Sequence, residues 1–226
     1  MARVRHVVVV AAVVDALALA GPGWAGGPKI ALNPQGEAAA KAAVLQRSDL
    51  AASAPWKGGR TKPHLPLGTP CPSYGFNPNQ SDLVVNGAAE SHYQLPGLAF
   101  YSQVEAMGTA RMAVLGWERY AVPAFTYCLK SSIQTTGGLP VAVTRLRVPR
   151  IGSFTAAYRV LIDNGLGDRL IEDVLLVANG RVRFSLNTYA ALGSALQPTA
   201  TINHAEAEVE AGELRLARSM AERGTA

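Results

Sequence analysis

The sequence has few cysteines, few charged residues and few aromatic residues. Of its 226 residues, 2 are cysteine, 16% are charged and 7% are aromatic. Motifs that define a chemistry are also missing: there is no G-x-S-x-G elbow, no H-E-x-x-H and no phosphate-binding P-loop. Without a C-x-x-C pair, and with only scattered histidines, the chain does not favour a metal site. The sequence therefore predicts no catalytic residue, no metal and no cofactor.

The positive charge of the chain is small and dispersed. The formal net charge is +5, and the only local basic cluster lies at residues 57–64. Proteins that bind nucleic acids usually gather lysine and arginine on one face. A solvated loop is the simpler interpretation of this cluster, and contact with an anionic surface is the alternative. We expect no nucleic-acid partner.

Residues 1–20 have the three parts of a secretory signal peptide. Arg3 and Arg5 give a positive start, residues 7–14 are an unbroken apolar run, and residues 18–20 form a small-residue exit. The apolar run is shorter than the roughly 20 residues that a membrane span requires, and no later segment is long enough. We expect a soluble mature protein that is secreted or located in the cell envelope.

Cleavage is expected between Ala20 and Ala25, within a flexible N-terminal segment over residues 21–32. Residues 33–226 are expected to form a single domain. Within it, residues 51–80 contain six prolines and four glycines. Because proline lacks a backbone N–H and resists helices and central strands, these residues predict a long loop. Loops of this length are usually functional or disordered.

Hydrophobic periodicity and turn residues predict the order helix, two strands, helix, four strands, helix. Asn33 and Pro34 are typical of a helix start, Pro123 should kink the second helix, and Asn179-Gly180 is typical of a hairpin turn. The expected helices cover residues 34–47, 110–133 and 202–223. The expected strands cover residues 83–93, 98–107, 140–148, 155–163, 169–178 and 181–189. The fold class is therefore α+β, with an antiparallel sheet of about six strands packed against helices.

The two expected turns in the second half also predict how three strands align. One turn covers residues 164–167, and the other is Asn179-Gly180. Counting outward from them places Tyr158, Asp173 and Leu186 on one rung of the sheet. Opposed residues of an antiparallel pair lie close enough to interact. The same counting sets residues 159 and 172 opposite each other, as a cross-strand ion pair of Arg159 with Glu172.

Tyr158 and Asp173 are the candidate ligand-binding residues. On this rung they would share the face of Phe184, which a helix should cover. A buried acid needs a hydrogen bond, and the Tyr158 hydroxyl could supply it. We interpret the pair as a structural contact, with a polar anchor in an otherwise apolar pocket as the alternative.

The two cysteines, Cys71 and Cys128, are expected to form a disulfide. An exported chain meets an oxidising compartment, where paired thiols become disulfides. Closing the loop between them would restrict the unfolded chain by about 4 kcal/mol in the loop-entropy model. The bond would hold the long loop at 51–80 to the expected helix at 110–133.

Two other functions are kept beside ligand binding. The first is a secreted hydrolase that uses His64 or His92, since a catalytic triad is recognised by geometry rather than by spacing. A histidine within about 3 Å of a serine, cysteine or acid in a cleft would favour it. The second is an envelope protein-interaction module, which a flat exposed apolar patch would favour. Each lone histidine is more simply explained as structural.

Four local patterns, at residues 39–50, 76–84, 109–113 and 152–158, carry a family resemblance. They resemble a group of exported actinobacterial proteins and, more distantly, the extracellular sensor domains of mycobacterial receptor kinases. The resemblance implies a Mog1/PsbP-like sandwich with a ligand cleft and no established reaction. It does not imply a signalling role here, because this sequence contains no kinase.

The leading hypothesis is an exported, non-enzymatic domain of the ligand-binding or sensor-like kind. Its expected partner is a small molecule or a cell-envelope component. The fold analogy alone supports this choice of partner.

Overall fold

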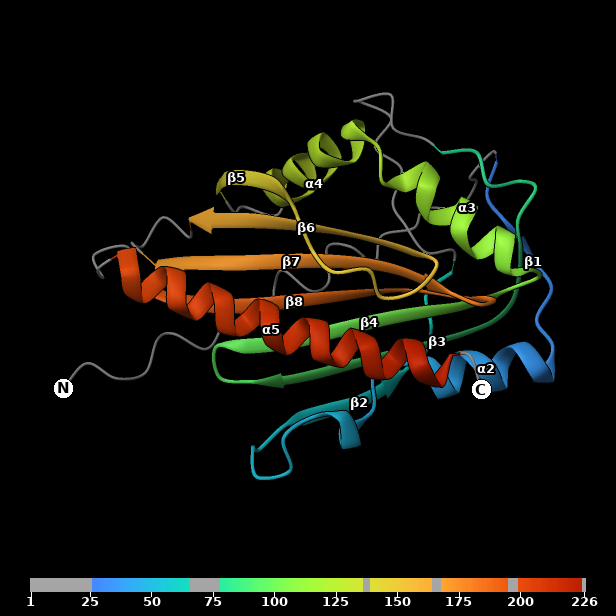
Figure 1. Cartoon of the computed structure of the whole chain (residues 1–226), viewed down its shortest axis with the longest axis horizontal. Coiled ribbons are helices and arrows are strands. Elements are labelled where there is room, and N and C mark those ends of the chain that lie inside the picture. The colour runs from blue at the N-terminus through green and yellow to red at the C-terminus, as the bar shows by residue number, and fades with distance from the viewer. Residues whose placement is uncertain (1–25, 66–77, 136–138, 164–167, 195–198, 225–226) are drawn as a thin grey trace.

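A computed structural model of the chain describes residues 26–65, 78–135, 139–163, 168–194 and 199–224 (Figure 1). The expected signal peptide at 1–20 lies outside these residues. The helices are α2 (Pro34–Ala43), α3 (Ala110–Tyr120), α4 (Pro123–Thr135) and α5 (Thr199–Arg223), with a 3₁₀ turn, η2 (Arg47–Asp49). The strands are β1 (Lys29–Ile30), β2 (Lys57–Thr61), β3 (Val84–Leu95), β4 (Leu98–Met107), β5 (Leu139–Leu146), β6 (Phe154–Asp163), β7 (Asp168–Asn179) and β8 (Val182–Ser194).

The α+β class predicted from the sequence is confirmed, and the sheet is larger than expected. The described strands form one sheet of eight rather than about six, in the order β1-β3-β4-β8-β7-β6-β5, and β2 also pairs with β3. β1 runs parallel to β3, whereas β3 and β4 are antiparallel, as are β7 and β8. The kink expected at Pro123 is a full break between α3 and α4. Proline at this position cannot donate a helix hydrogen bond.

Two segments that were expected to lack regular structure contain strands. β1 lies within the supposedly flexible residues 21–32, and β2 lies within the supposed loop at 51–80. Both pair with β3, so the partner strand satisfies their backbone groups. The expectation is wrong for these residues because β1 is only two residues long and β2 contains Gly58 and Gly59, which have low strand propensity.

Helices cover both faces of the sheet, so the fold has three layers (Figure 1). α5 crosses β7 and β8 on one face, where α2 also packs on β3 and β4. We call this the α5 face. α3 and α4 pack on the opposite face, which we call the α3 face. Because successive side chains of a strand alternate, a shift of one residue in register moves a side chain from one face to the other.

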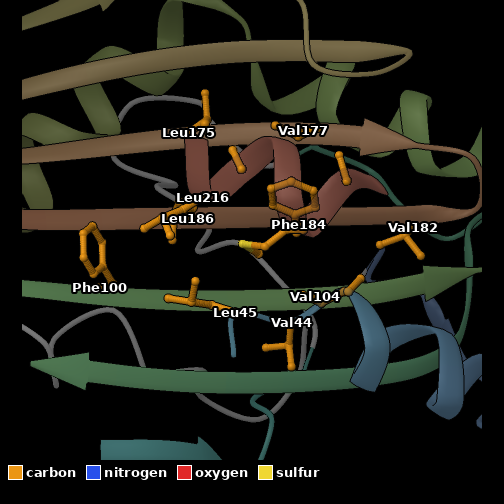
Figure 2. Close-up of a cluster of buried hydrophobic side chains, with 14 of the residues drawn as sticks. Val44, Leu45, Phe100, Val104, Leu175, Val177, Val182, Phe184, Leu186 and Leu216 are labelled. Atoms are coloured by element: carbon orange, nitrogen blue, oxygen red, sulfur yellow. The ribbon is translucent and has the colours of Figure 1, made fainter. Parts of the chain in front are cut away.

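The apolar core of the α5 face joins the centre of the sheet to two helices (Figure 2). Leu175 and Val177 come from β7, Phe184 and Leu186 from β8, and Leu216 from α5. All five are at most 2% exposed. Full burial of such a side chain stabilises the fold by roughly 1.5–3 kcal/mol. This cluster holds α5 on the sheet and so fixes where its C-terminal end meets α2.

Candidate functional site

A partly enclosed cavity of about 610 Å³ lies between α2, the C-terminal end of α5 and the β7–β8 hairpin. Figure 1 shows α2 beside that end of α5. The volume is in the range of small-molecule pockets, about 300–1,000 Å³. Most of the lining is small and apolar. It comprises Gln35, Gly36, Ala38, Ala39, Ala42, Ala106, Gly180, Arg181, Val182, Arg223 and Gly224.

The position of α2 sets one wall of the cavity. The Asn33 side chain caps the helix by accepting a hydrogen bond from the Gly36 N–H at 2.8 Å, and Pro34 occupies the first turn. Gly36 lies against the backbone of β3 at Asn86 and Gly87, where the strand is irregular. A Cβ on Gly36 would overlap the Asn86 carbonyl. Glycine is therefore required for α2 to lie this close to the sheet.

Arg223 joins the end of α5 to the end of α2. Its Nη1 and Nη2 donate to the two carboxylate oxygens of Asp49 at 2.7 and 2.8 Å, and its Nε donates to the Ala42 carbonyl at 2.8 Å. Such a bidentate pair is directional as well as charged. Asp49 neutralises the charge of this guanidinium. Arg223 therefore has a structural role, in which it holds the end of α5 against the end of α2.

Arg181 is the second cation that lines the cavity, and it is half-buried in the hairpin turn after Gly180. Its Nε donates to the Met107 carbonyl at 3.1 Å. With the Asn86 amide oriented so that both of its groups are satisfied, Arg181 Nη2 donates to the Asn86 side-chain oxygen at 3.1 Å. These acceptors are neutral. Within the described part of the chain, no carboxylate forms an ion pair with Arg181.

The expected pairing of Tyr158 with Asp173 is wrong. Tyr158 lies opposite Val174, and Asp173 lies opposite Arg159. The register of β6 and β7 differs by one residue from the one counted from a turn at 164–167. A one-residue shift places the two side chains on opposite faces of the sheet. The anchor inferred from their pairing is therefore not formed.

Asp173 is on the α5 face, where its partner is Arg159. Arg159 Nε and Nη2 donate to the two oxygens of Asp173 at 2.7 and 2.6 Å, and Nη1 donates to Glu206 of α5 at 3.1 Å. The expected pair of Arg159 with Glu172 is therefore also wrong, for the same one-residue reason. Tyr158 is buried on the α3 face.

The disulfide expected between Cys71 and Cys128 stays a prediction. Cys128 is 4% exposed and lies on α4, and Cys71 lies outside the described residues. Non-reducing peptide mapping of the exported protein is expected to give one cross-linked peptide that contains both cysteines. Recovery of two alkylatable thiols would contradict the prediction.

His64 lies beside a buried carboxylate. Its Nδ1 is 2.9 Å from Oε2 of Glu90, whose other oxygen accepts a hydrogen bond from Thr61 at 2.7 Å. Burial would raise the pKa of Glu90, but hydrogen bonds from Thr61, His64 and Tyr101 outweigh it and hold the pKa below its ordinary value. A carboxylate in this position orients an imidazole, as in a catalytic triad. Among the described residues, no serine or cysteine side chain hydrogen-bonds with this ring.

Among the described residues, no carboxylate hydrogen-bonds with His92, the other candidate of the hydrolase hypothesis. Burial lowers its pKa, and its Nε2 has no hydrogen-bond partner among the described residues. In the same part of the chain, no group of three or more His, Cys, Asp or Glu side chains could hold a metal ion. None of the described helices combines the length and apolar character that a membrane crossing needs.

Sequence reasoning did not identify the cavity. Its walls come from α2, β4, the β7–β8 turn and the end of α5, which are far apart in the chain. The helix start at Asn33-Pro34 and the turn at Gly180 were recognised, but nothing in the sequence says that they meet. Three alanines of α2, Ala38, Ala39 and Ala42, line the cavity.

Comparisons with known proteins concern the fold. No family model and no curated protein matches the chain. One similar solved structure is the extracellular domain of PknH from Mycobacterium tuberculosis, at 13% identity, 83% coverage of this chain, 97% of that chain and a TM-score of 0.42. Another is an uncharacterised protein, the Rv0999 ortholog from Mycobacterium smegmatis, at 13% identity, with coverages of 79% and 97% and a TM-score of 0.36. Both are mycobacterial proteins.

Proposed function

We propose that this chain is an exported, non-enzymatic domain that binds a small molecule in the cavity between α2 and α5. The observation that carries the proposal is the cavity itself: it has the volume of a ligand pocket, an apolar lining and few polar groups. Residues 1–20, which have the pattern of a signal peptide, support a ligand that is met outside the cytoplasm. Such a ligand is a free solute or a cell-envelope component.

A hydrolase that depends on His64 is the second candidate. The 2.9 Å contact between His64 and Glu90 favours it, since an acid–histidine pair is one half of a triad. No hydroxyl or thiol group of the described residues hydrogen-bonds with the His64 ring. Ligand binding is better supported, because the described residues are sufficient to line a cavity that could hold a ligand.

Native mass spectrometry of the protein purified from its own host tests the proposal. The wild-type protein is expected to carry a retained small molecule. Ala42→Phe places a large side chain in the cavity, where Ala42 is only partly buried. We expect this substitution to abolish or strongly reduce the bound mass, because the aromatic ring occupies the space of the ligand.

The matched control is Ala211→Phe, which makes the same change at an exposed position of α5. This variant is expected to retain the ligand, and circular dichroism should show that both variants are folded. A wild-type protein without bound mass, or equal occupancy in the two variants, would contradict the proposal.

A further inference from the structure

We infer that the ligand of this cavity is an anionic amphiphile. Its carboxylate or phosphate group is bound by Arg181, and its apolar part lies against the alanines of α2. The inference rests on the proposed function, because it names the class of molecule that the same cavity takes.

The first observation is a difference between the two arginines of the cavity. Asp49 neutralises Arg223 with two hydrogen bonds, whereas Arg181 is bonded to neutral oxygens of Met107 and Asn86. A charge removed from water is normally paired or hydrogen-bonded by an opposite charge. Among the described residues, Arg181 has no such counter-charge, so the cavity has one net positive group for a ligand anion.

The second observation is that Arg181 is already oriented. A guanidinium has five N–H donors in a fixed plane. The bonds to Met107 and Asn86 use one donor on Nε and one on Nη2 and hold that plane at the cavity wall. Donors on the outer edge of the group suit bidentate binding of a carboxylate or phosphate. An oriented cation loses little side-chain entropy when a ligand binds.

The third observation is the apolar lining beside this cation. Ala38, Ala42, Ala106 and Val182 line the same cavity as Arg181. A simple inorganic anion would contact only the guanidinium, and a hydrocarbon would contact only these side chains. A molecule with one anionic group and an alkyl part uses both, and burial of its alkyl surface adds to binding in proportion to its area.

Isothermal titration calorimetry with three probes tests the inference. Decanoate, 1-decanol and acetate are added to the full chain below the concentration at which decanoate forms micelles. Decanoate is expected to bind at least about tenfold more tightly than decanol, the advantage of a charged hydrogen bond, and acetate is expected not to bind measurably. Decyl phosphate against decanoate, at equal chain length, then distinguishes a phosphate head group from a carboxylate.

Arg181→Gln is expected to reduce decanoate affinity to that of decanol and to leave decanol affinity unchanged. Arg181→Lys keeps the charge and is expected to retain part of the preference. Arg215→Gln, at an exposed position of α5, is the control that should change neither affinity. Melting temperatures show that all variants are folded.

Decanol binding without a preference for decanoate overturns the inference and leaves the cavity proposal intact. A decanoate preference that survives in Arg181→Gln also overturns it. If neither probe binds, the inference fails, and the bound mass in native mass spectrometry decides the proposed function separately.

Discussion

Replacing Arg183 with methionine is expected to lower the free energy of unfolding by about 3–5 kcal/mol. Arg183 and Glu105 are both 0% exposed, and Nη2 and Nε of Arg183 lie 2.6 and 2.7 Å from Glu105 Oε2. Methionine fills similar space but leaves the Glu105 carboxylate buried without its counter-charge. Urea denaturation of the variant and the wild type measures the difference.

The exposed pair of Arg119 with Asp82 provides a matched control. Arg119 donates to both oxygens of Asp82 at 2.6 and 2.8 Å, but the two side chains are 29% and 57% exposed. Arg119→Met is therefore expected to cost less than about 1 kcal/mol. Adding Glu105→Leu to Arg183→Met removes both buried charges and should recover part of the loss. An Arg183→Met variant as stable as Arg119→Met would refute the argument.

The buried pair also explains how α3 packs on the sheet. A Cβ on Gly116 would overlap Arg183 Nη1, so α3 can cover this guanidinium only with glycine at that position. The Trp117 ring lies next to it, 5.0 Å from the Arg183 guanidinium carbon to the ring centroid. Gln80 accepts a further hydrogen bond from Nη2 at 2.9 Å. Arg183 is therefore part of the α3 interface.

The strands and helices with strong local patterns could be predicted from the sequence. β4 has the expected limits, and the break before Pro123 lies at the expected proline. These features depend on nearby residues, namely alternation, caps and prolines. β1 and β2 were missed because they form strands by pairing with β3, and their own residues carry no strong strand pattern.

Register was harder to predict because it depends on the exact length of a turn. In the β7–β8 hairpin, Asn179 pairs with Val182, so the turn consists of Gly180 and Arg181 rather than Asn179-Gly180. The pairing of β7 with β8 is therefore shifted by two residues from the expected one. A shift of two leaves every side chain on its expected face of the sheet. The pairing of β6 with β7 is shifted by one residue from the expected one. A shift of one moves the side chains to the opposite face of the sheet, so Tyr158 and Asp173 lie on different faces.

The candidate site could not be predicted for a related reason. Alternation in β8 indicates that Val182, Phe184 and Leu186 share a face, and all three are buried on the α5 face. It does not indicate that α2 and α5 leave a cavity beside Val182. It also does not indicate that α3 buries Arg183 on the other face.

Glu172 should make the stability of the protein fall as the pH rises. This carboxyl group is 2% exposed on β7, and burial raises its pKa from 4.5 to about 7. The Tyr189 hydroxyl donates to Glu172 Oε1 at 3.0 Å and opposes that shift, while the nearby charge of Asp173 adds to it. Between pH 4.5 and 7 the folded state holds a proton that the unfolded chain releases. The free energy of unfolding therefore decreases through this range.

Glu172→Gln is expected to remove this pH dependence. Glutamine has the shape of the protonated acid and can still accept the hydrogen bond from Tyr189. At pH 4 the variant and the wild type should be equally stable, and at pH 8 the variant should be more stable by about 3 kcal/mol. Urea denaturation at intervals from pH 4 to pH 8 measures both curves.

The difference between the two curves isolates Glu172 from other titrating groups. Burial also raises the pKa of Glu213, and the hydrogen bonds of Glu90 act in the opposite direction, but both groups are common to the two proteins. Glu118→Gln changes an exposed carboxyl on α3 and should give a curve parallel to that of the wild type. If the Glu172→Gln curve also runs parallel to the wild type, Glu172 is ionised in the folded protein throughout this range. In that case burial does not raise the pKa of Glu172 in the folded protein.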